Sequence, residues 1–496
     1  MDKNSFAFEH SVDRILPLLQ RSRSARDCTA KDGDQKSSGR RRFIIALGAG
    51  TMAAVTAELH APAAEPAGNA IHRRYMIDWS KRSSLATKNR LSMELEGTIS
   101  RPAVGDEGGS VEAIEIRSKS DFQFAEGSVW EQGKLVAVGR RYSLAEADTS
   151  IGRMATRSST LRADRRRTAL LFDGRQWSEF ATQAPLSNEE LELLHTPLFV
   201  SAVDQLLQHA PSADGSAKLS AEVLKELFLL QEIREHDVTV TPQTVKNGAA
   251  IYAVDGKLVG VTQGALTQLV LSGKLNAKTN ESGGYISWID IKLEEKRQES
   301  FVEPAFTVTA RIRLLREEIS EKELRRAGWS MERLAALPQA ADPMRWLVEI
   351  HAPACGFKCI ADRGWRMLFD NAEQAVLRWV ENEEVIAQCD ASRMPSLEPG
   401  MQLTLEAFQA EIERAAGDTL QQILQAEEKL TANGLRLLRC IVDGEIDGIP
   451  MQWVYCHLSD DTGRRLLLVF TVAGTHTDRF AAADEQVTTN LQLLSP

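Results

Sequence analysis

The sequence of 496 residues lacks most of the features that would place it in a special class of protein. Its 32 glycines and 16 prolines are too few for a collagen-like or low-complexity chain. No uncharged apolar run reaches the ~18–20 residues that a membrane-spanning helix requires, so we expect no transmembrane span. The net charge of −10 argues against a nucleic-acid partner, because nucleic acid is bound by a basic surface. At roughly 100–200 residues per domain, the length predicts two to four domains.

The chain also lacks the short motifs of common catalytic and nucleotide-binding sites. It contains no Gly-x-Ser-x-Gly, no His-Glu-x-x-His and no Gly-x-x-x-x-Gly-Lys-Ser/Thr pattern. The sequence therefore names no reaction, and we expect no cofactor.

The first 64 residues have the composition of an export signal with a polar N-terminal extension. The polar stretch ends in Arg40, Arg41 and Arg42, and the uncharged run from Phe43 to Ala57 follows. A helix of that length would span roughly 22 Å, short of the ~30 Å core of a membrane. The small residues Ala61 and Ala63 then form the kind of site that signal peptidase accepts, in the order typical of an export signal. A short membrane anchor or a buried helix is the alternative.

Two arginines, a spacer and Phe43 also resemble the twin-arginine export motif, with Arg40 and Arg41 as the pair. That resemblance implies export of an already folded protein, while the ordinary secretory route stays open. Either route predicts an extracytoplasmic protein, periplasmic or secreted. We expect residues 65–87 to be a linker.

Residues 88–318 are dominated by period-two alternation of apolar and polar side chains. Ile289, Ile291 and Leu293 alternate with charged residues, and the segment 306–314 follows the same rule. This pattern predicts strands of an antiparallel sheet with one buried and one solvated face. Ser187 and Ser220 each begin a segment with the pattern of a capped amphipathic helix.

We therefore expect about ten strands in a curved sheet, or half-barrel, that closes on two inserted helices. In strand order alone this region resembles the half-barrel of lipoprotein carriers of the LolA/LolB kind. The resemblance implies a cavity that holds acyl chains between the sheet and the helices near residues 187–230.

One segment of this region is rich in arginine, with nine arginines between Arg140 and Arg175. Because the planar guanidinium suits phosphate and carboxylate groups, an anionic ligand or partner is one interpretation. The other is that Arg162, Arg165 and Arg167 lie on solvated faces of edge strands, where charge discourages aggregation.

The remaining chain has a different rhythm. Residues 319–343 predict a helix and a proline-containing linker, and residues 344–496 predict a second domain of strands and helices. Thr404 is expected to cap a helix, and three long strands follow at 435–443, 451–458 and 466–473. A last helix is expected from Asp478 onward. The sequence as a whole therefore predicts an α+β protein of two domains, each an antiparallel sheet with packed helices.

Six parts of the second domain form a recognisable set: Ile360–Trp365, Gln388–Ala391, Leu403–Phe408, Ile449–Tyr455, Leu466–Val472 and Phe480. In these segments the domain resembles PsbP-like and DcrB-like extracytoplasmic domains, which are α/β sandwiches. The resemblance implies an accessory domain that binds other proteins, with no shared reaction.

Two sets of residues in the second domain are candidate sites. His351, Cys355 and Cys359 recur at a spacing of four, a formal metal-binding pattern, although buried apolar cysteines are the alternative and we expect no metal. Trp453, Tyr455 and His457 share one face of a strand and could form an aromatic binding surface, with core packing as the alternative. The five cysteines beyond the leader cannot all pair within one chain.

Together these features predict a non-enzymatic exported protein that binds a partner protein or an apolar or lipid ligand in the cell envelope. The alternative is an exported hydrolase that uses carboxylates such as Glu294, Glu295 or Glu303. We expect Glu294 to face outward, because it alternates with the apolar Leu293.

Overall fold

The structure, a computed structural model, describes residues 82–102, 111–153, 156–172, 177–198, 202–207, 216–246, 249–262, 265–278, 283–299, 305–339, 343–381 and 384–494. The predicted export signal, with Arg40, Arg41, Phe43, Ala61 and Ala63, lies outside the described residues. The chain divides between Arg345 and Trp346 into two units, within the short helix η6 (Pro343–Trp346). The described residues up to 345 are called the first unit, and those from 346 onward the second unit.

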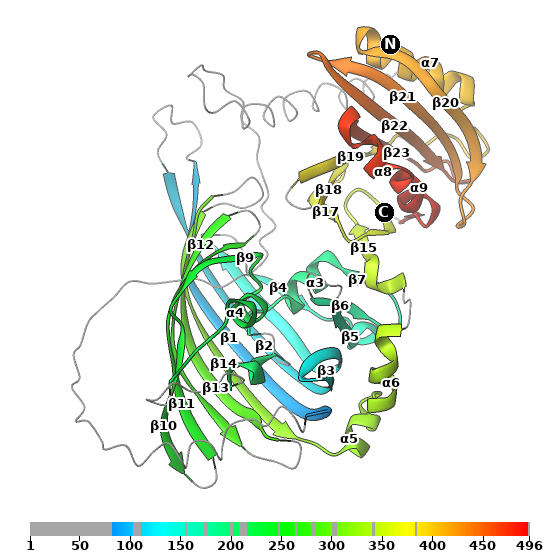
Figure 1. Cartoon of the computed structure of the whole chain (residues 1–496). Coiled ribbons are helices and arrows are strands. Elements are labelled where there is room, and N and C mark those ends of the chain that lie inside the picture. The colour runs from blue at the N-terminus through cyan, green and yellow to red at the C-terminus, as the bar shows by residue number, and fades with distance from the viewer. Residues whose placement is uncertain are drawn as a thin grey trace. The chain divides into compact units, whose positions relative to one another are not determined.

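A 13-stranded antiparallel sheet forms the first unit (Figure 1). In spatial order its main path is β6 (Trp177–Ala181), β5 (Arg167–Phe172), β3 (Lys134–Ile151), β2 (Val111–Glu131), β1 (Ser84–Pro102), β14 (Ala305–Glu318), β13 (Tyr285–Arg297), β12 (Ala265–Lys278), β11 (Ala249–Thr262), β10 (Thr239–Lys246) and β8 (Ala217–Lys218). β4 (Arg157–Thr160) pairs with β3, and β9 (Glu232–His236) pairs with β11. β1 and β14, the first and the last long strands, are neighbours, so the sheet joins distant parts of the chain.

Short helical segments are inserted between the strands. They are η3 (Ala163–Arg165), α3 (Asn188–Leu194), which follows the short strand β7 (Leu186–Ser187), η4 (Val203–Leu207) and α4 (Ala221–Phe228). The predicted caps are confirmed: Ser187 forms a capping box with Glu190, and the Ser220 hydroxyl accepts a hydrogen bond from the backbone of Val223. α4 lies in the hollow of the curved sheet (Figure 1).

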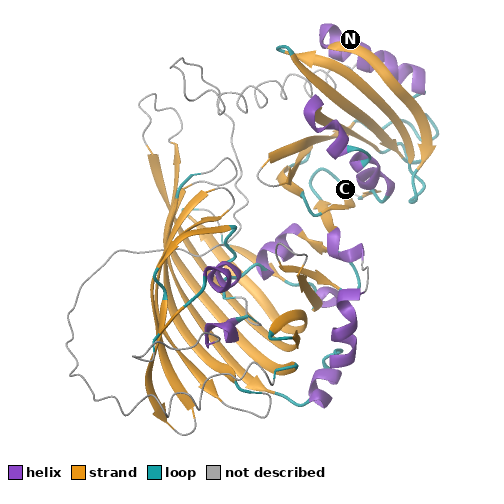
Figure 2. Cartoon of the chain, in the orientation of Figure 1, coloured by secondary structure: helices purple, strands orange, loops and turns teal. Residues whose placement is uncertain are grey.

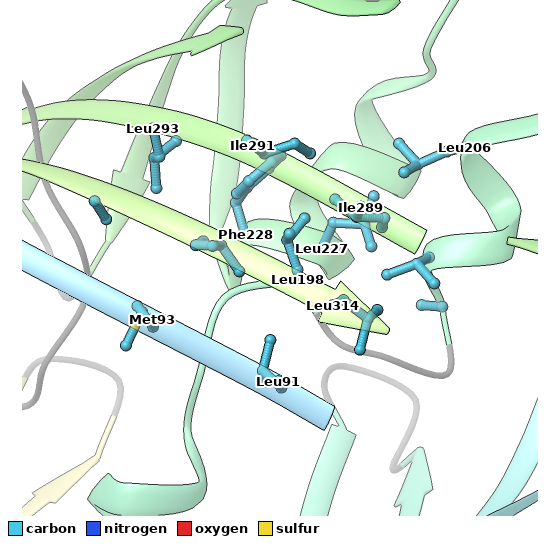
Figure 3. Packing of buried hydrophobic residues seen from close by; sticks show 14 of the residues in the cluster. Leu91, Met93, Leu198, Leu206, Leu227, Phe228, Ile289, Ile291, Leu293 and Leu314 are labelled. Atoms are coloured by element: carbon cyan, nitrogen blue, oxygen red, sulfur yellow. The ribbon is translucent and has the colours of Figure 1, made fainter. Parts of the chain in front are cut away.

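The core of the first unit lies between the inner face of the sheet and these helices. We call the side of the sheet that packs against α4 and η4 the inner face; on each strand, every second residue points to it. Leu227 and Phe228 of α4 lie against Ile289, Ile291 and Leu314 (Figure 3). All five are under 9% exposed, because period-two alternation turns the apolar residues of β13 and β14 to this side.

Two helices pack on the opposite, outer face. α5 (Glu321–Arg326) and α6 (Met331–Ala336), followed by η5 (Leu337–Gln339), bury Leu324, Trp329 and Leu334 against β2 and β3. Gly127 and Gly139 pair directly across these two strands. A Cβ on Gly139 would lie 2.6 Å from atoms of Leu334 and Trp329, so the glycine pair is what lets the helices approach the sheet.

A 7-stranded antiparallel sheet forms the second unit. Its order is β17 (Trp365–Asp370), β18 (Gln374–Glu381), β19 (Glu384–Met394), β23 (Arg465–Ala473), β22 (Ile449–Ser459), β21 (Arg436–Ile446) and β20 (Leu420–Leu430). β16 (Phe357–Asp362) pairs separately with β15 (Leu347–Ala352) and β24 (Gln492–Leu493). The three long strands predicted from the sequence are β21, β22 and β23, and Asp447 and Gly448 form the turn between the first two with positive φ angles.

The helices of the second unit are α7 (Leu405–Ala416), followed by η7 (Gly417–Thr419), then η8 (Gly474–His476), α8 (Thr477–Phe480) and α9 (Ala483–Thr489). Thr404 caps α7, as predicted. The single terminal helix predicted from Asp478 is wrong: Ala481, with φ of +42°, separates α8 from α9. Phe480, Val487 and Leu491 are still buried.

The predicted α+β class is wrong. Strands predominate in both units, and α7, with 12 residues, is the longest of the described helices (Figure 2). The alternation predicted strands correctly, but the strands are longer than expected, up to 21 residues in β2. The helices capped by Ser187 and Ser220 are short, with 7 and 8 residues. No helix in the described part of the chain is long and apolar enough to cross a membrane.

The glycine pair gives a test of this packing. Gly139→Ala should lower the free energy of unfolding of the full chain by about 1–3 kcal/mol, because the new methyl group overpacks the contact with Trp329 and Leu334. Urea unfolding measures the change. Glu146→Gln, at an exposed position of the same strand, should shift it by less than ~0.5 kcal/mol. Equal effects of the two substitutions would contradict the close approach.

Candidate functional site

The inner face of the first unit is apolar along most of its length. On β14 the inward residues are Phe306, Val308, Ala310, Ile312, Leu314 and Arg316. The first five are among the buried apolar residues packed with the inserted helices. Arg316, 4% exposed, ends the series, so the face changes from apolar to polar at one end.

A row of buried polar side chains crosses the sheet at that end. We call it the polar belt; its members are Thr87, Asn89, Glu126, Ser128, Arg140, Tyr142, Thr168, Glu179, Arg316 and, from η4, Asp204. The register brings them together: Asn89 pairs with Arg316, Thr87 with Glu126, and Arg140 with Thr168. The sequence patterns did not indicate the belt, although Arg316 lies two residues beyond the end of the predicted alternation at 306–314.

Asp204 joins the belt to the inserted helices. Its Oδ2 accepts a hydrogen bond from Arg82 Nη1 at 2.6 Å, and its Oδ1 accepts from Arg316 Nη1 and from the Ile286 backbone N–H, each at 2.7 Å. Burial disfavours the charged carboxylate, but Arg316, Arg82 and the Ile286 N–H together lower the pKa of Asp204 below its ordinary value. The carboxylate is therefore ionised at neutral pH and shared by two guanidinium groups.

Arg140 is the centre of the rest of the belt. Its Nε donates to Glu126 at 2.8 Å and its Nη1 to Glu179 at 3.1 Å. The hydroxyls of Tyr142 and Thr168 also donate to Glu179, at 3.0 and 2.6 Å. Burial, only partly offset by Arg140, raises the pKa of Tyr142, so this phenol remains protonated and acts as a donor.

The opposite end of the inner face holds a separate ion pair. Arg297 Nε donates to Glu295 Oε1 at 2.9 Å, and the Arg297 guanidinium lies 4.4 Å from the centre of the Phe306 ring. Both charged residues are about 5% exposed. The inner face is therefore an apolar surface with buried charge at each end.

The carboxylates named for a hydrolase do not come together. Glu294 lies on the outer face of β13 and accepts from Lys292 at 2.8 Å, as its alternation with Leu293 predicted. Glu295 is on the inner face with Arg297, and Glu303 lies outside the described residues. Glu294 and Glu295 point to opposite sides of one strand and cannot act on one bond.

Of the three arginines expected on solvated faces, Arg165 is 7% exposed, so that interpretation is wrong for it, whereas the Arg162 side chain is 39% exposed. The Arg162 guanidinium donates to Glu190 at 2.7 and 2.8 Å, and Arg165 donates to the Pro185 carbonyl at 2.8 Å. Arg157 Nη2 donates one hydrogen bond to Glu189, and both of these side chains are exposed. These arginines hold α3 and the segment before it against the sheet.

In the second unit, the predicted aromatic surface is covered. Trp453, Tyr455 and His457 do share one face of β22, but they are at most 5% exposed and lie in the core beneath α7, with Phe408 5.8 Å from the His457 ring. Burial, with Arg465 and Arg436 nearby, lowers the pKa of His457 to about 4, so its ring is neutral at physiological pH.

The three residues of the formal metal-binding pattern do not come together either. His351 is exposed on β15, whereas Cys359 is buried and pairs with Ile350, and Cys355 lies in the turn between β15 and β16. Burial raises the pKa of Cys355 and of Cys359 to about 12, so both thiols are protonated. Among the described residues, no three His, Cys, Asp or Glu side chains are placed to hold a metal ion.

A second polar group that the sequence did not indicate lies on β18 and β19, which β23 separates from β22. Asp390 accepts from Gln388 Nε2 at 2.9 Å, and Arg378 Nε donates to Gln388 Oε1 at 3.0 Å. Burial raises the pKa of Asp390 to about 6, against the opposing effects of Gln388 and Arg378. This carboxyl group therefore changes its charge just below neutral pH.

Comparison with known proteins gives only partial structural likenesses. No protein-family model and no curated protein matches the chain. Similar solved structures include cyanobacterial PsbP (CyanoP) from Synechocystis sp. PCC 6803, with 14% identity over 31% of this chain and 96% of that chain at a TM-score of 0.24. Another is lipovitellin, in a structure describing its lipid–protein interactions, with 9% identity over 48% of this chain and 25% of that chain at a TM-score of 0.26. The immunity protein TplEi of Pseudomonas aeruginosa follows, with 11% identity over 49% of this chain and 74% of that chain at 0.20.

These scores are too low to support an argument about function. The resemblance to PsbP is confirmed as a partial likeness, and those to DcrB-like and LolA/LolB-like domains stay predictions. The chain spans about a quarter of the lipovitellin chain.

The Asp390 carboxyl group gives a pH-dependent prediction. Because its pKa is raised from 3.8 to about 6, the folded state holds a proton in that window and loses stability as pH rises through it. Asp390→Asn removes this cost, so it should raise the free energy of unfolding by about 1–3 kcal/mol at pH 7.5, and the gain should disappear below pH ~4. Urea unfolding at several pH values measures it.

Asp461→Asn, at an exposed position, is the matched control and should give less than ~0.5 kcal/mol at every pH. A gain from Asp390→Asn that does not depend on pH would contradict the raised pKa.

Proposed function

We propose that the first unit binds an amphipathic, lipid-like ligand on its inner face, and that the protein acts without catalysis in the cell envelope after export. The observation that carries the proposal is the division of the inner face into a long apolar part and a buried polar belt. An amphipathic molecule is divided in the same way, into an apolar chain and a polar head group.

Packing alone does not account for the belt. Removing a charge from water costs several kcal/mol per ion, and replacing buried ion pairs by well-packed apolar residues is often neutral or stabilising. Yet Asp204, Arg316, Glu126 and Arg140 are all at most 5% exposed in the interior of this unit. A role in recognising a polar group explains why such residues lie beside an apolar surface.

The two helices that cover the inner face are held in different ways. The Asp204 carboxylate fixes η4 to Arg316 and to the Ile286 backbone, whereas α4 contacts the sheet through apolar side chains such as Leu227. The Leu198 N–H donates to Leu227 O within the cover itself, at 2.6 Å. A ligand that enters between α4 and the sheet therefore replaces apolar contacts, and it leaves both the Asp204 hydrogen bonds and the ladder of β13, β14 and β1 in place.

Filling the apolar part of the inner face tests the proposal. Ala310 is fully buried at the middle of β14, and Ala310→Phe should weaken binding of dodecanol and of long-chain lipids to the full chain by tenfold or more, since a lost contact of about 1.4 kcal/mol is tenfold in affinity. Isothermal titration calorimetry measures the binding.

Thr307→Phe adds the same ring on the outer face of the same strand and should leave binding unchanged. Circular dichroism and urea unfolding establish that both variants fold. If the folded wild-type protein binds no apolar ligand, the proposed function is wrong.

The leader gives a separate prediction about location. If Arg40 and Arg41 form a twin-arginine signal, Arg40→Lys combined with Arg41→Lys should leave the uncleaved precursor inside the cell, as fractionation and immunoblotting would show. Arg23→Lys combined with Arg26→Lys is the control and should be exported normally. A wild-type protein that keeps its leader and stays in the cytoplasm would contradict export altogether.

A further inference from the structure

The polar belt contains two neighbouring hydrogen-bond donors without an acceptor in the described part of the chain. They are the Nε of Arg316 and the Nδ2 of Asn89. The two residues are 4% and 0% exposed. Buried polar groups are almost always hydrogen-bonded, so two such donors together call for an acceptor.

The register places these two donors side by side. Asn89 on β1 pairs directly with Arg316 on β14, which puts their Cβ atoms ~4.5–5.5 Å apart on the same face. The next inward residues on the two strands are Leu91 and Leu314, which also pair with each other across β1 and β14. The donors therefore lie where the polar belt meets the apolar part of the inner face.

The other contacts of both side chains leave these atoms available. Asn89 uses its Oδ1 to accept from the Thr87 hydroxyl at 3.2 Å. Arg316 uses its Nη1, which donates to Asp204 at 2.7 Å and to Ile286 O at 3.1 Å. Asp204 also pairs with Arg82. One carboxylate therefore holds Arg316 in place but balances only part of the charge of the two guanidinium groups.

Charge favours an anion at this position over other acceptors. Glu126 and Glu179, the carboxylates of the rest of the belt, are engaged by Arg140 at the β2, β3 and β6 side. Hydrogen bonds from a guanidinium to a carboxylate or phosphate are about twice as strong as those between neutral groups. The part of the belt over β14 and β1 is thus its cationic part.

We propose that Arg316 and Asn89 bind the anionic head group, carboxylate or phosphate, of the amphipathic ligand, and that Asp204 and Arg82 position Arg316 for this contact. The inference rests on the proposed function. The head group lies against the two donors, and the apolar chain extends from there over Leu91 and Leu314 along the inner face.

Three ligands of one chain length test the head-group preference. Dodecanoate and dodecyl phosphate carry an anionic head, and dodecanol carries the same chain with a neutral head. The wild-type full chain should bind either anion at least tenfold more tightly than dodecanol, because a hydrogen bond from a guanidinium to an anionic oxygen is about twice as strong as one to a neutral hydroxyl. Inorganic phosphate and acetate, which have no chain, should bind far more weakly.

Two variants locate the preference. Asn89→Asp places a carboxylate of the protein beside Arg316, so it should abolish the preference for dodecanoate over dodecanol while keeping dodecanol binding. Arg316→Met removes the guanidinium but leaves Asp204 with Arg82 and the Ile286 N–H, and should have the same effect. Arg311→Met, which removes the same charge from the outer face of β14, should change nothing.

The outcomes separate the two proposals. If dodecanol and dodecanoate bind wild type equally, or if a folded Asn89→Asp protein keeps the full preference, the head-group assignment is wrong and the proposed function stands. If none of the twelve-carbon ligands binds, the proposed function fails. Inorganic phosphate binding as tightly as dodecyl phosphate would show a free-anion site and overturn the assignment to a lipid head group.

Discussion

The Asp204 carboxylate is the interaction on which the interior of the first unit depends. It joins Arg82, just before the first strand, to Arg316 on the last long strand and to the backbone of Ile286. It is carried by η4, a single turn that is not part of the sheet. One buried group thus ties the first strand, the last strands and the inserted cover to one another. Since removing one partner of a buried ion pair costs about 3–5 kcal/mol, the position of the cover is strongly coupled to this carboxylate.

The same interaction decides the character of the inner face. A sheet with one apolar face normally gains stability by burying only apolar side chains there. In this unit charged groups occupy both ends, with Arg316 and Asp204 at one and Glu295 with Arg297 at the other. On β14, Arg316 lies ten positions after Phe306, which packs on Arg297. At 3.3 Å per residue these two residues are roughly 33 Å apart, with the apolar surface between them. A binding surface of that form accounts for the buried charge better than packing does.

The local features of this fold could be predicted from the sequence, because they depend on residues close to one another in the chain. Alternation identified β13 and β14 and the face of Leu293, and hydroxyl caps placed the starts of α3, α4 and α7 at Ser187, Ser220 and Thr404. The proportion of residues in strands and in helices could not be predicted from local patterns, because the length of a strand depends on pairing with neighbouring strands. The break at Ala481 is similar: the apolar residues have helical spacing, but α8 packs on β19 and β23 while α9 packs on β16 of a separate sheet.

The candidate site depends on contacts that local patterns do not contain. Asp204 and Arg316 are 112 residues apart, and Asp204 and Arg82 are 122 apart, so their meeting is a property of the register of the whole sheet. For the same reason Arg162 and Arg165 appeared solvated in the sequence, although they bind Glu190 and the Pro185 carbonyl. Trp453, Tyr455 and His457 were correctly assigned to one face, but only the position of α7 shows that this face is core.

If the inner face of the first unit holds an amphipathic anion, the protein purified without detergent from its own cells will carry that ligand. Native mass spectrometry should then show a protein ion with one additional mass, which organic solvent releases as an anionic amphiphile. A folded protein that repeatedly shows only the mass of its own chain would contradict this prediction.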